Sequence, residues 1–324
     1  MRAAVRDRFG SPADVVEIRD AEKPVPADDE LLVRVRASSV NITDWYSVTG
    51  RPWVGRPQMG LRKPKSGRLG VDFAGTVEDV GKDVTLFAVG DDVFGGRDGA
   101  FAEYVCVREE RAVVQKPATA SFAEAAAVPV AALTALQGLR DKGELEPGQR
   151  VLINGASGGV GTFAVLVAKA LGAHVTAVCS THNVETARSL GADEVVDYTR
   201  DDFTRSGERY DLMLDIAGSR SWSACTRVLE PNATVVIVGG PKSNRLLGPI
   251  GHVVRMRLRS MLGSRKTVFF VAKFNKPDME VLRELLEAGK LTTAIDRSYP
   301  LSEIADALAY LGKGHARGKI LITV

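Results

Sequence analysis

The stretch Val151-Leu-Ile-Asn-Gly-Ala-Ser-Gly-Gly-Val-Gly161 decides the fold of this 324-residue chain. It opens with three apolar residues of strand character and continues into a glycine-rich turn. Residues 162–171 have the apolar spacing of a helix, and Gly172 ends that helix. Glycines let the backbone turn tightly and approach phosphates, while free N–H groups at a helix start favour anionic oxygens. The stretch therefore predicts a dinucleotide-binding turn between a strand and a helix.

Strands and helices continue to alternate after this turn. Residues 174–179 are expected to form a second strand, 184–190 a helix, and 194–198 a third strand. Three further apolar runs would bring the sheet to six strands: 210–216, 233–238 and 266–271. This alternation predicts a doubly wound parallel α/β sheet, with the cofactor lying across the point between the first and fourth strands.

The first 120 or so residues have a different pattern of short β-strands. Val33 and Val35 alternate with Arg34 and Arg36, which predicts a strand with one apolar and one wet face. Glycines and prolines separate such runs, so we expect a compact β-barrel-like domain. Residues 51–70 have no periodicity and predict a long loop, which is either a solvated connector or an active-site lid.

Composition excludes several classes of function. A formal net charge of +3 is too small to indicate nucleic acid or a membrane surface as a partner. The three cysteines are too widely spaced to form a disulfide framework or a zinc motif. The N-terminus lacks the apolar core of a signal peptide, and no apolar run is long enough to span a bilayer. We therefore expect a cytoplasmic protein. Residues 252–266 carry five cations, but a solvated helix face is favoured over an anion or RNA site because no aromatic residues are interleaved.

Several motifs together resemble the medium-chain dehydrogenase/reductase superfamily, in its zinc-independent quinone oxidoreductase branch. Besides the glycine turn they are Asn41-Ile-Thr-Asp44 and the segments 70–81, 89–94, 132–135 and 314–319. The resemblance implies a GroES-like β-barrel catalytic domain built from residues 1–122 and 272–324. It also implies a Rossmann domain with a six-stranded parallel sheet at residues 123–271, and a homodimer.

The resemblance also bears on metal binding. Zinc-dependent relatives place a cysteine where this chain has Asn41 and a histidine where it has Val71, and their third ligand position falls on Val130. Valine cannot ligate zinc, and asparagine is a poor ligand beside thiolate, imidazole or carboxylate. We therefore expect no zinc and no other metal.

Site residues follow from the resemblance. Asn41 and Tyr46 are the expected hydrogen-bond donors to substrate, Thr43 is expected near the nicotinamide, and Asp44 is expected to orient these groups. The alternative for each is loop capping or core hydrogen bonding. The residues expected to bind cofactor are Thr134, Ala156, Ser157, Gly158, Gly159, Val160, Ser180, Thr181, Tyr198, Gly239, Phe270 and Arg317.

Cofactor choice depends on the end of the second strand of the sheet. NAD-specific sites place an acidic residue there, which bonds the ribose 2′-hydroxyl. This chain has Cys179-Ser-Thr-His182 instead, so hydroxyl groups of Ser180, Thr181 and, by resemblance, Tyr198 are expected to hold a 2′-phosphate. NADPH is therefore the expected cofactor, with use of NADH left open.

The first functional hypothesis is an NADPH-dependent, zinc-free reductase that transfers hydride to a quinone or an α,β-unsaturated carbonyl. A second is a reductase of enoyl thioesters, or another alcohol or carbonyl oxidoreductase of this fold, in which Arg62, Lys63 and Lys65 would meet a phosphorylated carrier. A third, of a different class, is a non-catalytic NADPH-binding protein with a crystallin-like or RNA-binding role.

Overall fold

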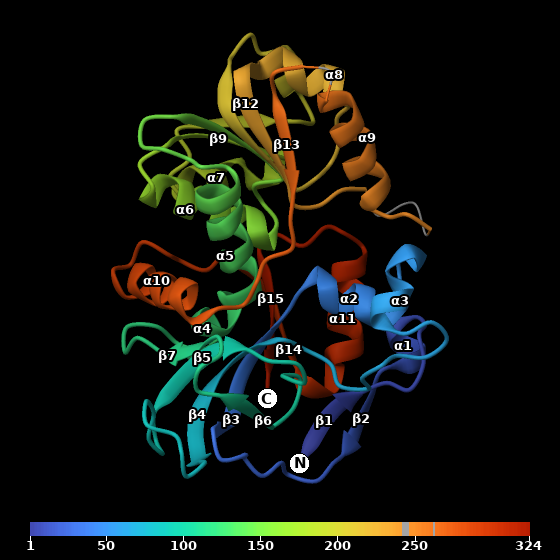
Figure 1. The fold of residues 1–324 in the computed structure, drawn as a ribbon, viewed down its shortest axis with the longest axis vertical. Helices are drawn as coiled ribbons and strands as arrows, with labels where there is room; N and C mark the ends of the chain where they lie inside the picture. The colour runs from blue at the N-terminus through green and yellow to red at the C-terminus, as the bar shows by residue number, and fades with distance from the viewer. Residues whose placement is uncertain (242–245, 262) are drawn as a thin grey trace. The chain divides into compact units, whose positions relative to one another are not determined.

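The computed structural model describes residues 1–241, 246–261 and 263–324, which form two compact units (Figure 1). Unit 1 comprises Met1–Leu133 and Lys273–Val324, and unit 2 comprises Thr134–Ala272. The first boundary lies later than the 122/123 expected from sequence. The reason is that helix α4 (Phe122–Ala127) packs against strands β3 and β4 of unit 1, so its residues stay with the barrel strands.

Unit 2 contains a six-stranded sheet whose strands are all parallel, as expected. The spatial order is β10-β9-β8-β11-β12-β13, so the chain reverses its direction of travel across the sheet between β8 and β11. The strands are β8 (Arg150–Asn154), β9 (His174–Cys179), β10 (Glu194–Asp197), β11 (Tyr210–Asp215), β12 (Leu229–Ile237) and β13 (Lys266–Phe269). This is the strand order of a doubly wound dinucleotide-binding fold.

Helices connect these strands. The expected helix after the glycine turn is present as α6, which begins three residues earlier than expected, at Gly159, because the glycines themselves form its first turn. Unit 2 helices are α5 (Pro129–Leu136, which begins in unit 1), a π-helix (Gln137–Lys142), α6 (Gly159–Ala170), η3 (Thr181–Asn183), α7 (Val184–Ser189), η4 (Phe203–Arg205), α8 (Trp222–Cys225), η5 (Thr226–Val228) and α9 (Ile250–Ser260).

The sheet of unit 2 is covered by apolar side chains. Leu152, Met213 and Val235 come from neighbouring strands and are fully buried in one cluster, which Val253 and Met256 of α9 join. Burial of each such side chain stabilises the fold by about 1.5–3 kcal/mol. The carboxyl ends of the strands are thus held at one edge of a rigid sheet.

Unit 1 is built on a seven-stranded, largely antiparallel sheet and a separate β1–β2 pair. The spatial order is β14-β15-β3-β4-β5-β7, and β6 pairs with β3. In the long strand β3, Val33 and Val35 are buried and Arg34 and Arg36 are exposed, as the sequence predicts. The strands are β1 (Arg2–Val5), β2 (Glu17–Asp20), β3 (Glu30–Val40), β4 (Asp72–Val80), β5 (Asp92–Gly96), β6 (Tyr104–Arg108), β7 (Val113–Gln115), β14 (Ile295–Pro300) and β15 (Lys319–Thr323).

Short helices accompany this sheet: α1 (Pro12–Val15), α2 (Ile42–Thr49), η1 (Trp53–Gly55), α3 (Arg56–Met59), α4, α10 (Lys276–Glu287), η6 (Leu301–Glu303) and α11 (Ile304–Gly312). The segment 51–70 is therefore not the structureless loop that was expected, because η1 and α3 lie within it. No helix in the described ranges is both long enough and apolar enough to cross a bilayer.

Candidate functional site

The glycine turn leaves β8 at the point where the sheet reverses. Gly155 has a φ of 98°, which favours glycine, and a Cβ on Gly161 would lie 2.1 Å from the carbonyl oxygen of Gly155. Gly158 is the N-cap of α6, and no side chain caps the helix there. The N–H groups of the first turn of α6 are thus left without a side-chain partner. A phosphate accepts hydrogen bonds from such groups, so this turn fits a dinucleotide pyrophosphate.

The surface of the glycine turn also leaves room for a ligand beside Gly158. A Cβ on Gly158 would find its nearest neighbour 3.8 Å away, so the surface of the turn is open there. Ala156 is buried, while Ser157, Gly159 and Val160 are partly exposed. The expected residues of the turn therefore lie together around one helix start.

A buried polar network, which the sequence did not reveal, joins the two strands at the reversal. Asn154 ends β8 and donates from Nδ2 to Oδ1 of Asp215, the last residue of β11, at 2.7 Å. The same oxygen accepts the N–H of Gly218 at 2.9 Å, and Oδ2 lies 3.1 Å from Nε2 of His252 in α9. These contacts fix the strand ends next to the glycine turn. The only sequence signal was a polar residue at the end of each apolar run.

The expected 2′-phosphate residues lie around the ends of β9 and β10. Ser180 Oγ accepts from Nδ2 of Asn183 at 2.9 Å, and the side chain of Tyr198 is 55% exposed. Thr181 Oγ1, however, donates to Oδ2 of Asp197 at 2.5 Å, and this bond lowers the pKa of Asp197 below its usual value. No carboxylate was expected here, because the residues that follow β9, Ser180–Thr181–His182, include none. This expectation was wrong, since β10 brings Asp197 to the same place.

The remaining expected cofactor residues are spread over both units. Gly239 follows β12, and a Cβ there would lie 2.3 Å from the carbonyl oxygen of Ile216. Phe270 follows β13, and Thr134 is the first residue of unit 2. Arg317 belongs to unit 1, where its N–H donates to Asp296.

Unit 1 holds a buried cluster of charged and polar side chains. Lys319, Asp72 and Asn41 are 2%, 0% and 6% exposed. Lys319 Nζ donates to Asn41 Oδ1 at 2.6 Å and lies 3.4 Å from Asp72 Oδ2. Asp72 Oδ2 also accepts from Asn41 Nδ2 at 2.8 Å and Ser39 Oγ at 2.7 Å. Burial lowers the pKa of Lys319. A charged side chain is costly to bury unless it is paired and hydrogen-bonded, and both Lys319 and Asp72 have such partners here.

The structure corrects the expected role of Asn41. Its Nδ2 donates both to Asp72 and, at 3.4 Å, to the carbonyl oxygen of Ser39, so both amide hydrogens are used within the protein. Asn41 therefore has no hydrogen left to donate to a substrate. Its side chain instead ties the start of α2 to Asp72 and Lys319.

Asp44 lies in the first turn of α2 and is 3% exposed. Its Oδ2 accepts the N–H of Asn41 at 2.7 Å. Burial raises the pKa of Asp44 to about 7, and the nearby Asp72 adds to this rise, while the Asn41 N–H and Lys319 oppose it. Asp44 thus holds the start of α2, and its pKa lies near neutral pH. Its expected role in orienting the substrate-facing groups stays a prediction.

Tyr46 and Thr43 both lie on α2. Within the described ranges, neither hydroxyl has a hydrogen-bond partner. The Tyr46 ring packs edge-on to Trp45 at 5.5 Å, and burial raises the pKa of Tyr46 to about 12. Tyr46 therefore remains a protonated donor across the neutral range, and Thr43 is exposed.

The three positions considered for zinc also meet near Asp72. Asn41 Nδ2 donates to Oδ2 of Asp72, and the backbone N–H of Val130 donates to Oδ1 at 3.0 Å. Val71 immediately precedes Asp72. The cation at this place is the Lys319 ammonium. Within the described ranges, no group of three or more His, Cys, Asp or Glu side chains could hold a metal ion.

Comparison with known proteins identifies the relatives of this chain. Residues 27–118 match the alcohol dehydrogenase GroES-like domain, and residues 190–322 match the zinc-binding dehydrogenase family. A chloroplastic quinone-oxidoreductase homolog of Spinacia oleracea is 35% identical, over 99% of this chain and 98% of its own. A mitochondrial NAD(P)H oxidoreductase of Mus musculus is 34% identical, over 91% of this chain and 82% of its own.

A solved structure agrees with the fold throughout. The quinone oxidoreductase from Coxiella burnetii is 30% identical and superposes with a TM-score of 0.85, covering 100% of this chain and 99% of its own.

Proposed function

The chain belongs to the medium-chain dehydrogenase/reductase superfamily, among its quinone oxidoreductase homologues, and we propose that it reduces a quinone or an α,β-unsaturated carbonyl with NADPH and without zinc. The observation that carries the proposal is the position of the glycine turn, at the start of α6 and at the reversal point of a parallel sheet. A bound nicotinamide cofactor supplies the hydride, and the protein supplies orientation and hydrogen-bond donors.

Zinc independence is supported by the chemistry around Asp72. Asn41, Val71 and Val130 offer no thiolate or imidazole, and the Lys319 ammonium already neutralises the buried carboxylate. Alcohol oxidation in zinc-dependent relatives relies on a Lewis acid to stabilise an alkoxide. Without one, the acceptor must already be electrophilic, as quinones and enones are.

Tyr46 is the donor that we assign to the developing enolate or quinol oxygen. Its hydroxyl has no partner in the described ranges, and its raised pKa keeps the proton in place. A hydrogen-bond donor aimed at charge that develops in the transition state accelerates such a reaction. Asn41 and Asp44 act through the position of α2, and Thr43 offers a second, exposed hydroxyl.

NADPH is proposed as the preferred cofactor because Ser180 and Tyr198 present hydroxyls at the end of β9 and β10, and Arg200 lies close by. The Arg200 Nε is 3.7 Å from Asp197 Oδ2, so a cation balances the carboxylate there. Asp197 itself works against a 2′-phosphate. We propose that Arg200 and the two hydroxyls outweigh this effect of Asp197.

Turnover measurements test the proposal. NADPH oxidation is followed with 1,2-naphthoquinone, a cyclic enone and crotonyl-CoA as acceptors, and each is repeated with NADH. We expect turnover of the quinone or the enone. Faster reduction of crotonyl-CoA would favour an enoyl thioester reductase, in which the exposed Arg62, Lys63 and Lys65 meet the carrier. Tight NADPH binding without turnover of any acceptor would favour the non-catalytic alternative.

A homodimer is proposed on the resemblance alone. Light scattering of the purified chain measures its molar mass directly, and a mass near the 34.7 kDa of one chain would contradict the proposal.

A further inference from the structure

Among the residues that the structure describes, helix α9 has one apolar face that packs into the core of unit 2 and a second that is exposed. Val253 and Met256 are buried in the core of the unit. Val254, Leu258 and Met261 are 49%, 62% and 75% exposed. Spacings of four and three residues place these three side chains on one line along the helix, roughly opposite the buried face. A surface helix normally has a polar outer face, so an apolar outer face on α9 is unusual.

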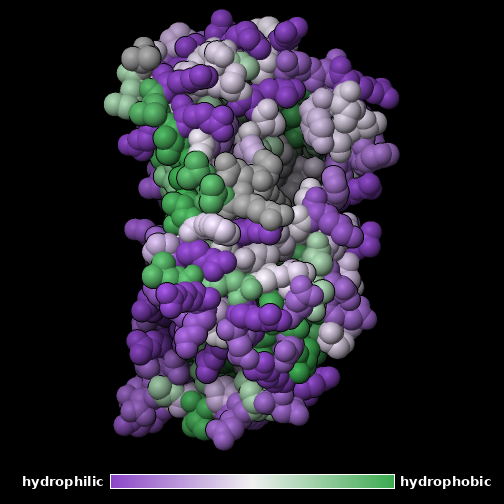
Figure 2. Space-filling model, turned by 90° about the vertical axis from the view of Figure 1, so that its right-hand side faces the viewer, coloured by the Kyte–Doolittle hydropathy of each residue, from purple (hydrophilic) through white to green (hydrophobic). Residues whose placement is uncertain are grey.

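The line continues through the partly exposed Ile250 at the start of the helix to Leu247, which precedes the helix. Leu247, Ile250, Val254, Leu258 and Met261 together form what we call the apolar stripe. Figure 2 views this side of the molecule, where hydrophobic residues gather in a band along α9. Contiguous apolar surface of this kind marks an interaction site on a folded protein.

Arginines border the stripe on both sides. By the helical repeat, Arg257 lies along one edge and Arg255 and Arg259 lie along the other. In the part of the chain that the structure describes, none of the three forms an ion pair, although Arg255 Nε donates to the carbonyl oxygen of Gly251. These cations are therefore available to an external anion.

The surrounding sequence has charge of one sign. Residues 231–277 contain nine Lys or Arg residues and no Asp or Glu. Of these cations, Arg255, Arg257 and Arg259 are exposed residues of α9 itself. The stripe with its bordering arginines therefore suits an occupant that is both apolar and negatively charged.

We propose that the apolar stripe of α9 binds the surface of a bilayer that contains anionic lipids. A helix with an apolar face bordered by arginines lies in the plane of such a surface, with its apolar side chains about 5–10 Å into the headgroup boundary and its cations at the phosphates. A second copy of this chain suits the stripe less well, because a twofold contact would bring the same arginines of both copies together.

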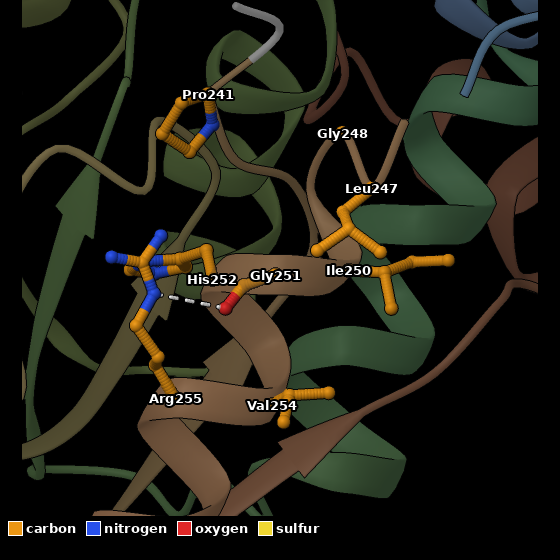
Figure 3. A pocket seen from close by; sticks show the side chains of 8 residues that line it. All are labelled: Pro241, Leu247, Gly248, Ile250, Gly251, His252, Val254 and Arg255. Atoms are coloured by element: carbon orange, nitrogen blue, oxygen red, sulfur yellow. Dashed lines mark hydrogen bonds between the residues drawn. The ribbon is translucent and has the colours of Figure 1, made fainter. Parts of the chain in front are cut away.

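A cavity adjoins the stripe at the start of α9. Its volume is ≈ 550 Å³, and Leu247, Ile250 and Val254 supply apolar walls. Figure 3 shows these three side chains on one side of the helix and Arg255 on the other. These apolar walls extend the apolar stripe to the start of the helix.

Sedimentation of the full chain with vesicles tests the proposal. We expect binding to vesicles of phosphatidylcholine with phosphatidylserine, little binding to phosphatidylcholine alone, and release by salt. The double variant Arg257→Ala/Arg259→Ala should bind about 25-fold more weakly, since each arginine near an anionic surface contributes about fivefold. Leu258→Ser/Met261→Ser should also weaken binding, although it leaves the charge unchanged.

The matched control is Leu86→Ser, because Leu86 is a 50% exposed leucine of unit 1. This variant should bind vesicles like the parent. Absent binding to anionic vesicles, or equal binding to both compositions, overturns the proposal. So does a Leu258→Ser/Met261→Ser variant that binds vesicles normally but has a lower molar mass in solution, since the stripe would then cover a second copy.

Discussion

The ammonium group of Lys319 donates a hydrogen bond to the side-chain oxygen of Asn41 at 2.6 Å, although the two residues are 278 positions apart in the chain. Strands β15 and β3 bring them together, because Ile320 pairs with Val40 in the antiparallel register. The contact ties the last strand of unit 1 to the start of α2, on which Thr43, Asp44 and Tyr46 lie.

Replacing Lys319 should destabilise unit 1 strongly. Lys319→Met leaves the fully buried Asp72 without its cation, and loss of one partner of a buried pair costs about 3–5 kcal/mol. Urea unfolding measures the loss. The double variant Lys319→Met/Asp72→Asn should recover part of it, because no unpaired charge remains. Equal stability of the single and double variants would contradict this account.

Asp44 should make stability depend on pH. Its pKa is about 7 in the folded protein and near the ordinary 3.8 when unfolded, so the folded state binds the extra proton between these values. Its contribution to stability is complete below pH 3.8 and is lost as the pH rises to about 7. Asp44→Asn should remove this fall, which is measured as the difference in unfolding free energy between parent and variant across that range. A constant difference would show that Asp44 does not titrate there.

Tyr46→Phe should lower kcat/KM for the quinone or enone roughly a hundredfold, because it removes one donor to the developing oxyanion. Cofactor affinity and thermal stability should stay the same, since the hydroxyl has no partner in the described ranges. Steady-state kinetics and cofactor titration provide the measurements. Tyr299→Phe, in another part of unit 1, is the control. Unchanged kinetics in Tyr46→Phe would remove this residue from the mechanism.

Asp197→Asn should shift cofactor preference toward NADPH. The carboxylate lies against Thr181 and would repel a 2′-phosphate, while it can bond a ribose hydroxyl. We expect the NADPH-to-NADH ratio of kcat/KM to rise about fivefold, a moderate change because salt screens a charge near the surface. Asp201→Asn, at an exposed neighbouring position, should leave the ratio unchanged. A falling ratio in Asp197→Asn would contradict the assignment.

Two glycine substitutions separate folding from cofactor binding. Gly161→Ala places a Cβ 2.1 Å from the Gly155 carbonyl oxygen, so it should distort the turn and lower both stability and NADPH affinity. Gly158→Ala meets nothing closer than 3.8 Å, so it should fold normally and weaken only NADPH binding, by obstructing the approach of the pyrophosphate. Thermal melts with and without NADPH distinguish the two. Normal NADPH binding in both variants would show that the pyrophosphate does not lie at this turn.

The sequence by itself determined the parallel sheet and its six strands. Residues 151–161 and the alternation that follows are local patterns, in which each strand and helix is set by the apolar spacing of its own residues. The glycine turn could also be predicted from the sequence, because the close contact of Gly161 with Gly155 lies within the turn itself.

Only the tertiary structure decided which distant polar side chains meet. The pairing of Lys319 with Asn41, of Asp215 with His252 and of Asp197 with Thr181 each joins residues from different strands or helices, and no local pattern marks them. The outward apolar face of α9 could not be predicted from the sequence either. An apolar residue spaced for burial can be recognised from the sequence, but the side of the helix that the core covers is set by where the helix packs.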